Sequence, residues 1–235
     1  MDDHRLRTVL ERLATHQDNP GTSIGAALCA TCVDVAHVAG AALTISAGPG
    51  EGHLSIASSG PVMSELEELE RTFGEGPCVD AYLTGRPVAE PDLANPTAPR
   101  WVAFTPEAVR AGARAAFGYP LQVAASRFGA LNLYASEPGL LTEEQHEHTL
   151  VVADLATHII VTSQHAGPVD VLVEELVDVS TNQLEIHQAA GMTSVQLRIS
   201  ISEALLRLRG HAFAEGLPLS AVAVEVVERR MRLDP

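Results

Sequence analysis

Apolar residues recur at helical spacing through about the last fifty residues of the chain, where they form three runs. The first run ends at Gly191, and the second and third are joined at Gly216. The most regular stripe consists of Ala204, Leu205, Leu208 and Ala212. Residues spaced in this way share one face of a helix, so the stripe is predicted to be buried. The pattern predicts a small unit of three helices over residues 182–232.

The beginning of the chain mixes helical and strand patterns. A short amphipathic helix is expected over residues 5–13, and a second helix follows Thr22 or Ser23, either of which can cap it, and ends at Gly40. Residues 41–46 and 53–58 are predicted to be two strands joined by a glycine-rich hairpin loop. That loop connects two strands and lacks a following Lys-Ser/Thr pair, so a turn is favoured over a phosphate-binding loop.

Two pairs of residues have the spacing of a capping box, which marks the start of a helix. Ser64 with Glu67 predicts one helix, and Thr142 with Gln145 predicts a long one that ends near Gln164. A further helix is expected to begin at residues 101–104, and strands are expected around 117–121 and 129–134. The acidic run of the first of these helices, Glu65, Glu67, Glu68 and Glu70, is interpreted as a solvated face.

Residues 165–168, which include a glycine and a proline, are predicted to separate two domains. The expected organisation is an N-terminal helix over 1–20, a first domain over 21–166, and a helical linker with a three-helix domain over 167–235. Apolar positions alternate three and four apart along Val169, Leu172, Leu176, Val179, Gln183 and Ile186. This seam predicts a coiled-coil homodimer, with a helix docked on its own domain as the alternative.

Composition places the chain among globular proteins. Of its 235 residues 46% are hydrophobic and 19% are charged, which is enough apolar material for a core. No apolar run reaches the roughly 18 residues that a membrane span requires, and the start of the chain lacks the pattern of a signal peptide. A cytoplasmic location without membrane contact is therefore expected.

Charge is unevenly distributed. The chain contains no lysine, and its formal net charge is −15. Residues 191–235 carry six arginines and five acidic residues, a net charge of +1, which leaves −16 for residues 1–190. Non-specific adhesion to nucleic acid needs a surplus of cations and is not expected, so no DNA binding is predicted.

Candidate catalytic and metal sites are sparse. Cys29 and Cys32 have the spacing of a redox or metal pair, but they lie within a predicted helix, so small core residues are the favoured interpretation. Cys78 is favoured as a buried thiol over a redox or ligand contact. His146 and His148 fall on different helix faces, so no metal is predicted. No acid, base and nucleophile come together in the sequence, and an enzyme is not expected.

The C-terminal unit resembles the ANTAR family, a three-helix RNA-binding module of bacterial transcription antiterminators. Three blocks occur in order: Gln-Ala-Ala-Gly at 188–191, Glu-Ala-Leu-Leu-Arg-Leu-Arg at 203–209, and Leu-Ser-Ala-Val-Ala at 219–223. The family pattern is roughly Gln-Ala-Lys-Gly, Ala-Phe-x-x-Leu-Arg and Leu-x-x-Val-Ala. Ala190 therefore stands where the family usually has lysine.

The resemblance implies that this unit binds RNA through arginine contacts to phosphates and polar contacts to loop bases. The residues on the implied RNA face, or in its packing support, are Gln188, Ala189, Ala190, Gly191, Arg198, Arg207 and Arg209. Two alternatives stay open. Arg209 can instead tie helices together, and Arg229, Arg230 and Arg232 can simply complement a helix C-terminus.

Residues 20–163 resemble a GAF domain, the small-molecule sensor fold, in the variant that actinobacterial proteins couple to ANTAR. The motifs are Gly-Glu-Gly-Pro-Cys at 74–78, Asp-Leu at 92–93, Arg-Trp at 100–101, Pro-Leu at 120–121 and Gly-Ala-Leu-Asn-Leu-Tyr at 129–134. The ligand is not implied. Apolar and thiol side chains expected to face the sheet form the candidate pocket: Cys29, Cys32, Phe73, Cys78, Tyr82, Trp101, Phe104, Leu121 and Leu133.

Together the two resemblances imply an α/β (α+β) GAF-like domain with a central antiparallel sheet, followed by an all-α three-helix ANTAR-like domain. The expected function is a signal-responsive transcription antitermination regulator, in which an unidentified small-molecule ligand of the sensor controls binding to stem-loops of nascent RNA. The alternative is a protein-interaction regulator, or a small-molecule or redox sensor, that has lost RNA binding.

Overall fold

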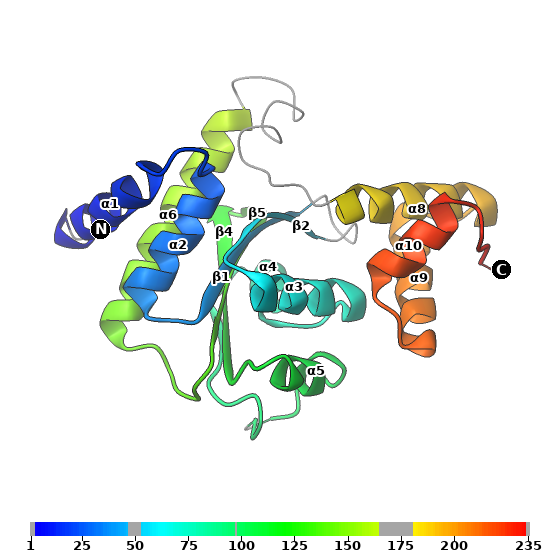
Figure 1. Ribbon diagram of the computed structural model, residues 1–235, viewed down its shortest axis with the longest axis horizontal. Helices are drawn as coiled ribbons and strands as arrows, with labels where there is room; N and C mark the ends of the chain where they lie inside the picture. The colour runs from blue at the N-terminus through cyan, green and yellow to red at the C-terminus, as the bar shows by residue number, and fades with distance from the viewer. Residues whose placement is uncertain (1–2, 47–52, 97, 165–180, 234–235) are drawn as a thin grey trace.

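The computed structural model describes residues 3–46, 53–96, 98–164 and 181–233. A five-stranded antiparallel sheet lies at the centre of the first domain, in the order β2-β1-β5-β4-β3 (Figure 1). The strands are β1 (Gly40–Ser46), β2 (His53–Ser58), β3 (Val88–Glu90), β4 (Ala115–Val123) and β5 (Ser126–Ala135).

Helices cover both faces of this sheet (Figure 1). One face packs against α1 (Asp3–Gln17), α2 (Ile24–Ala36) and α6 (Glu143–Gln164). The other face carries α3 (Pro61–Phe73), α4 (Pro77–Thr84) and α5 (Phe104–Arg110). The predicted α/β domain with a central antiparallel sheet is confirmed.

Side chains on the strands alternate between the two faces, as a pleated sheet requires. On β4, Phe117, Tyr119 and Leu121 join the core beneath α1, α2 and α6, whereas Ala116 joins the core beneath α3 and α5. On β5, Leu131 and Leu133 point to the first core and Tyr134 packs against the second. The sheet therefore separates two apolar layers.

Over residues 181–233 the chain forms three helices: α8 (Thr181–Leu197), α9 (Ile201–Glu215) and α10 (Leu219–Val227). They share a core of their own, which consists of Ile186, Ala189, Ala190, Leu205, Leu208, Ala212, Leu219, Val222, Ala223 and Val226. The predicted stripe on the middle helix is thus buried. The unit lies beside α3 of the first domain (Figure 1).

Several predicted helix ends are confirmed. Ser23 caps α2 by accepting a hydrogen bond from the Ala26 N–H at 3.1 Å. Thr142 and Gln145 form the reciprocal bonds of a capping box, at 2.8 and 3.2 Å, immediately before α6. Gly216 ends α9 in the left-handed conformation, with φ of 63°. In each case the local polar group satisfies a backbone group that the helix end leaves unpaired.

Other boundaries differ from the predictions. The helix α3 begins at Pro61 rather than at Ser64, because Pro is well suited to the first helical position and Gly60 before it adopts a positive φ of 115°, which glycine tolerates. The helix α2 ends at Ala36, followed by the left-handed C-cap residue His37, and does not extend to Gly40. The helix α8 continues through Gly191 to Leu197, so Gly191 does not end it. The glycine-rich loop and most of the predicted coiled-coil seam lie outside the described residues.

Among the helices that the structure describes, none combines the length and the apolar character needed to cross a membrane.

Candidate functional site

Two carboxylates of α3 point into the protein. Glu67 and Glu70 are only 4% and 5% exposed, so the prediction of a solvated acidic face is wrong for these two residues. The reason is the face of α3 on which they lie. Met63, Glu67 and Glu70 fall at i, i+4 and i+7, which is the spacing of a single buried stripe.

Glu70 is held by hydrogen bonds from one helix and one strand. Its Oε1 accepts a hydrogen bond from the Cys78 N–H at 2.9 Å, at the start of α4, and its Oε2 accepts one from the side chain of Asn132 on β5. Cys78 in turn has its thiol 3.1 Å from the Thr44 hydroxyl on β1. This network ties α3 and α4 to the middle of the sheet.

A small cavity lies beside the network. Its lining consists of Thr44, His53, Glu67, Glu70, Arg71 and Cys78, and its volume is about 10 Å³. That is about the space one water molecule occupies, so the cavity has no room for a larger ligand in this conformation. Among the described residues, no group of three or more His, Cys, Asp or Glu side chains is arranged to hold a metal ion.

The cavity groups titrate abnormally because they are removed from water. Desolvation raises the pKa of Glu67 to about 7 and that of Glu70 to about 8, although nearby hydrogen bonds and Arg71 act in the opposite direction. Desolvation, together with the charges of Arg209 and Arg71, lowers the pKa of His53 to about 4. Within the described residues, Glu67 Oε1, Asn132 Oδ1 and His53 Nδ1 are buried without a hydrogen-bond partner. The cavity therefore holds polar groups that a bound molecule or a proton could satisfy.

The residues predicted to line a ligand pocket do not come together. Cys29, Cys32, Leu121 and Leu133 belong to the core beneath α1, α2 and α6, whereas Phe73, Trp101 and Phe104 pack on the opposite side of the sheet. Tyr82 makes an edge contact with His53, with ring centroids 5.0 Å apart. Of the predicted set, only Cys78 lines the small cavity.

All three thiols are expected to resist modification in the folded protein. Cys29, Cys32 and Cys78 are free and buried, and burial raises the pKa of each thiol. Since the thiolate is the reactive form, a thiol-reactive dye at pH 8 should label none of them within minutes, and all three after denaturation. Rapid labelling of one thiol in the native protein would contradict the buried, protonated state described.

The predicted RNA-binding residues of the C-terminal unit separate into two groups. Ala189 and Ala190 lie in the core of that unit, 0% and 1% exposed, so they can contribute packing only. Gln188, Arg198 and Arg207 are exposed, and Gly191 is half-buried. Arg209 is largely covered, and its Nε donates a hydrogen bond to the Arg71 carbonyl at 2.8 Å. Its position agrees with the alternative in which Arg209 ties helices together.

Two arginines occupy backbone positions that favour glycine. Arg198 follows α8 with φ of 57°, and Arg229 follows α10 with φ of 60°. Each sits at the turn of a Schellman-type helix end, shown by the 3.2 Å bond from Ile199 N to Ser194 O and the 2.9 Å bond from Arg230 N to Glu225 O. A left-handed backbone costs a non-glycine residue about 1 kcal/mol. Both sites therefore keep a cationic side chain at some cost in stability.

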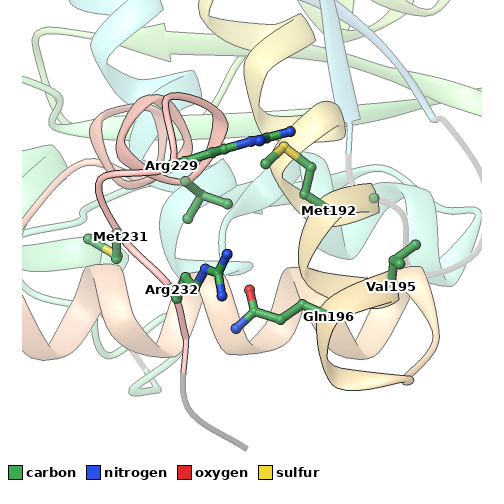
Figure 2. A pocket seen from close by; sticks show the side chains of 8 residues that line it. Met192, Val195, Gln196, Arg229, Met231 and Arg232 are labelled. Atoms are coloured by element: carbon green, nitrogen blue, oxygen red, sulfur yellow. The ribbon is translucent and has the colours of Figure 1, made fainter.

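An open hollow of about 650 Å³ lies between α8 and the end of α10 (Figure 2). Its lining consists of Gly191, Met192, Val195, Gln196, Val226, Arg229, Met231 and Arg232. Figure 2 shows the ends of the Gln196 and Arg232 side chains directed toward each other, and Gln196 Nε2 donates to the Leu233 carbonyl at 2.8 Å. The hollow combines apolar surface with two cationic side chains, which suits a ligand that has both anionic and stacking groups. This hollow was not predicted from the sequence. Arg229 and Arg232 were expected only as part of a basic terminus and not among the RNA-contacting residues.

Comparison with known proteins supports the fold of the first domain. The GAF domain of the Acinetobacter phosphoenolpyruvate-protein phosphotransferase matches with a TM-score of 0.53 at 13% identity, over 71% of this chain and 99% of that one. The free methionine-R-sulfoxide reductase from Neisseria meningitidis, solved with its substrate, matches with a TM-score of 0.51 at 15% identity, over 71% of this chain and 96% of that one. At such identity the likeness concerns the fold alone. The search of curated proteins returned no match.

The sequence profile described as the GAF domain matches residues 22–161, from just before α2 almost to the end of α6. This range contains the five strands, the helices α2, α3, α4 and α5, and nearly all of α6, whereas α1 precedes it. It also covers more than half of the chain. The protein therefore belongs to the GAF domain family, whose members serve as sensor and ligand-binding modules in signalling proteins.

Proposed function

We propose that this protein is a signal-responsive RNA-binding regulator of transcription antitermination, in which the GAF domain controls the three C-terminal helices. The observation that carries the proposal is the distribution of charge. Four exposed arginines, Arg198, Arg207, Arg229 and Arg232, lie on the C-terminal unit, and no ion pair joins any of them to a described residue. The rest of the chain carries the acidic excess.

Arginine suits RNA in two ways. Its guanidinium pairs with phosphate oxygens and can also stack on an unpaired base. An acidic GAF domain beside these arginines repels nucleic acid from the rest of the surface, which restricts binding to the arginine-bearing face. The resemblance of residues 188–223 to ANTAR points to stem-loops as the form of RNA.

A homodimer is the arrangement in which such a unit can hold two stem-loops at once. Two linked sites gain affinity from each other without additional contacts. In the proposed mechanism a small ligand of the GAF domain changes how the two helical units are presented. The protein acts by binding in the cytoplasm, without catalysis and without DNA.

A second function, docking of a protein partner, is favoured by exposed apolar side chains on the C-terminal unit. Leu184 and Val195 on α8 and Leu206 on α9 are 61%, 81% and 66% exposed. Exposed apolar side chains of this size often mark a protein interface. The two functions differ in salt dependence, because phosphate contacts weaken as counterions accumulate and apolar contacts do not.

The Arg198→Gly variant tests the proposed role of arginine directly. Glycine fits the left-handed position, so the free energy of unfolding of the variant should be about 1 kcal/mol higher than that of the wild type. Loss of one phosphate contact should weaken binding to a paired stem-loop RNA and lower the slope of log affinity against log salt by about 1. Mobility shifts and thermal melts measure the two effects.

Arg86→Ala is the matched control, because it removes the same charge from an exposed site of the GAF domain. Its RNA affinity should stay close to that of the wild type. If Arg198→Gly is more stable and binds RNA as tightly as the wild type, Arg198 takes no part in binding and the proposed RNA face is wrong.

A further inference from the structure

Helix α10 begins without a cap of its own. Its N-cap position is Pro218, which offers no side-chain acceptor, so the first backbone N–H groups of the helix depend on other partners. These partners come from the GAF domain. The Leu219 N–H donates to the Thr72 hydroxyl at 3.1 Å, and the Ser220 N–H donates to Glu68 Oε1 at 3.1 Å. Two residues of α3 therefore cap a helix about 150 positions later in the chain.

The residues at the centre of this contact are buried from solvent. Thr72 is 4% exposed and Leu219 is fully buried. Without the Thr72 hydroxyl, the Leu219 N–H would be buried with no acceptor, and a buried unsatisfied donor is costly. The cap is therefore part of the packing between the two domains and not a surface contact.

The end of α3 also holds Arg209. The carbonyl of Arg71, in the last turn of α3, accepts the hydrogen bond from Arg209 Nε. Carbonyl groups at a helix C-terminus carry partial negative charge, which favours a cation there. Phe73 and Phe213 pack edge to face next to this bond, with ring centroids 6.1 Å apart. Burial lowers the pKa of Arg209, as expected for a guanidinium largely removed from water.

The opposite side of α3 lines the cavity of the GAF domain. Glu67 and Glu70 point into that cavity, whereas Glu68 and Thr72 point to α10. Arg71 belongs to both sites. It lines the cavity, and its backbone carbonyl accepts the hydrogen bond from Arg209 Nε. A shift of α3 that admits a molecule into the cavity would therefore also move the groups that cap α10.

We infer that α3 masks part of the RNA-binding surface of the C-terminal unit. In this closed arrangement the N-terminus of α10 and Arg209 are withheld from RNA. Release of the contact with α3 exposes a cationic side chain and two N–H donors, groups that bind phosphate oxygens. The inference rests on the proposed RNA-binding function. It implies that α3 and RNA compete for the same face of the C-terminal unit.

The test uses the full chain with the double substitution Thr72→Val and Glu68→Ala, which removes both acceptors. The control is Thr84→Val with Glu65→Ala, the same changes at exposed sites of α4 and α3 that do not contact α10. Hydrogen exchange at the Leu219 and Ser220 amides measures the cap. Mobility shift with a paired stem-loop RNA measures the masking.

We expect amide exchange at both positions to become about tenfold faster in the uncapped variant, the change that loss of a helix cap typically produces. RNA affinity should rise by a similar factor, and adding Arg209→Ala should reverse the rise. Thr72→Ser with wild-type Glu68, which keeps the hydroxyl, should behave as the wild type. The control variant should change neither exchange nor affinity.

Three results would overturn the inference. Unchanged exchange in the uncapped variant would show that α3 does not hold α10. Faster exchange without tighter RNA binding, in a protein that does bind RNA, would show that the contact masks nothing. If no variant binds RNA although exchange responds, the proposed function itself fails, and the masking fails with it.

Discussion

The Gly129→Ala variant should have a free energy of unfolding about 3 kcal/mol lower than that of the wild type. A Cβ at this position on β5 would lie 1.9 Å from the Thr44 carbonyl oxygen and 2.8 Å from the Ile45 Cα on β1. Both atoms belong to the backbone of the neighbouring strand, so no side chain can turn aside to make room. Overpacking typically costs about 1–3 kcal/mol, and a clash with strand backbone belongs at the upper end of that range. The fluorescence of Trp101, the sole tryptophan, reports unfolding of this domain in urea.

Gly210→Ala is the matched control. It makes the same chemical change in the middle of α9, where an added Cβ meets nothing within 4 Å. Alanine is favoured over glycine in a helix by about 1 kcal/mol, so this variant should be slightly more stable than the wild type. A Gly129→Ala protein as stable as the wild type would contradict the close pairing of β1 and β5.

The second large effect is a loss of stability as pH rises toward 8. The pKa values of Glu67 and Glu70, about 7 and about 8, lie above the ordinary value of 4.5. A carboxyl whose pKa is raised by folding stabilises the native state fully below its unfolded pKa, and this contribution is lost as pH rises through the folded pKa. His53 acts in the opposite sense, because its pKa is lowered to about 4, but its contribution is complete above about pH 6.5. The fall should therefore be clearest between about pH 6.5 and 8.

The Glu70→Gln variant isolates this effect. An amide cannot ionise, so the free energy of unfolding should fall less with pH in the variant than in the wild type. At pH 8 the variant should be more stable by on the order of 2 kcal/mol, whereas Glu65→Gln at an exposed site of α3 should change little. Urea titrations at pH 5, 6.5 and 8 measure the slopes. Parallel slopes for the wild type and Glu70→Gln would show that Glu70 does not titrate in this range.

Much of the fold could be predicted from local pattern. The strands β1, β2 and β5 follow runs of apolar residues, and the caps Ser23 and Thr142 are short-range signals that need no tertiary structure. The misplaced start of α3 shows the limit of such signals. Ser64 with Glu67 has capping-box spacing, but Gly60 and Pro61 form an earlier start that takes precedence.

The candidate site was harder to predict because it depends on contacts between distant parts of the chain. Glu70 is held by partners on β5 and α4, and Glu67 is buried beside it at the cavity, so an acidic run alone gave no sign of either. The available clue was that Glu67 and Glu70 share one helical stripe with the apolar residue Met63, which indicates a buried face. The face that Leu121 and Leu133 share follows from the register of β4 on β5, which sequence alternation within one strand does not give. Trp101 and Phe104 could not join them there.

Arg209 illustrates the same limit in the C-terminal unit. Its place in the ANTAR-like pattern suggested RNA contact, yet its nearest partner is a carbonyl of α3, 138 positions earlier. Ala190 was recognised as a departure from the family pattern, and its burial in the helical core follows from its position between Ile186 and Thr193 on one face of α8. In this arrangement Arg198, Arg207, Arg229 and Arg232 are the exposed arginines that can meet RNA, whereas Arg209 is covered.

The most direct test of the account is the salt dependence of RNA binding by the intact wild-type protein. A fluorescently labelled RNA with two adjacent stem-loops would be titrated with protein at 50 and 200 mM salt, with a single-stranded RNA of the same composition as the control. The account predicts binding that prefers the stem-loops and weakens at least tenfold at the higher salt, because arginine-phosphate contacts release counterions. Absence of binding at 50 mM salt, or binding that is indifferent to both salt and RNA structure, would contradict it.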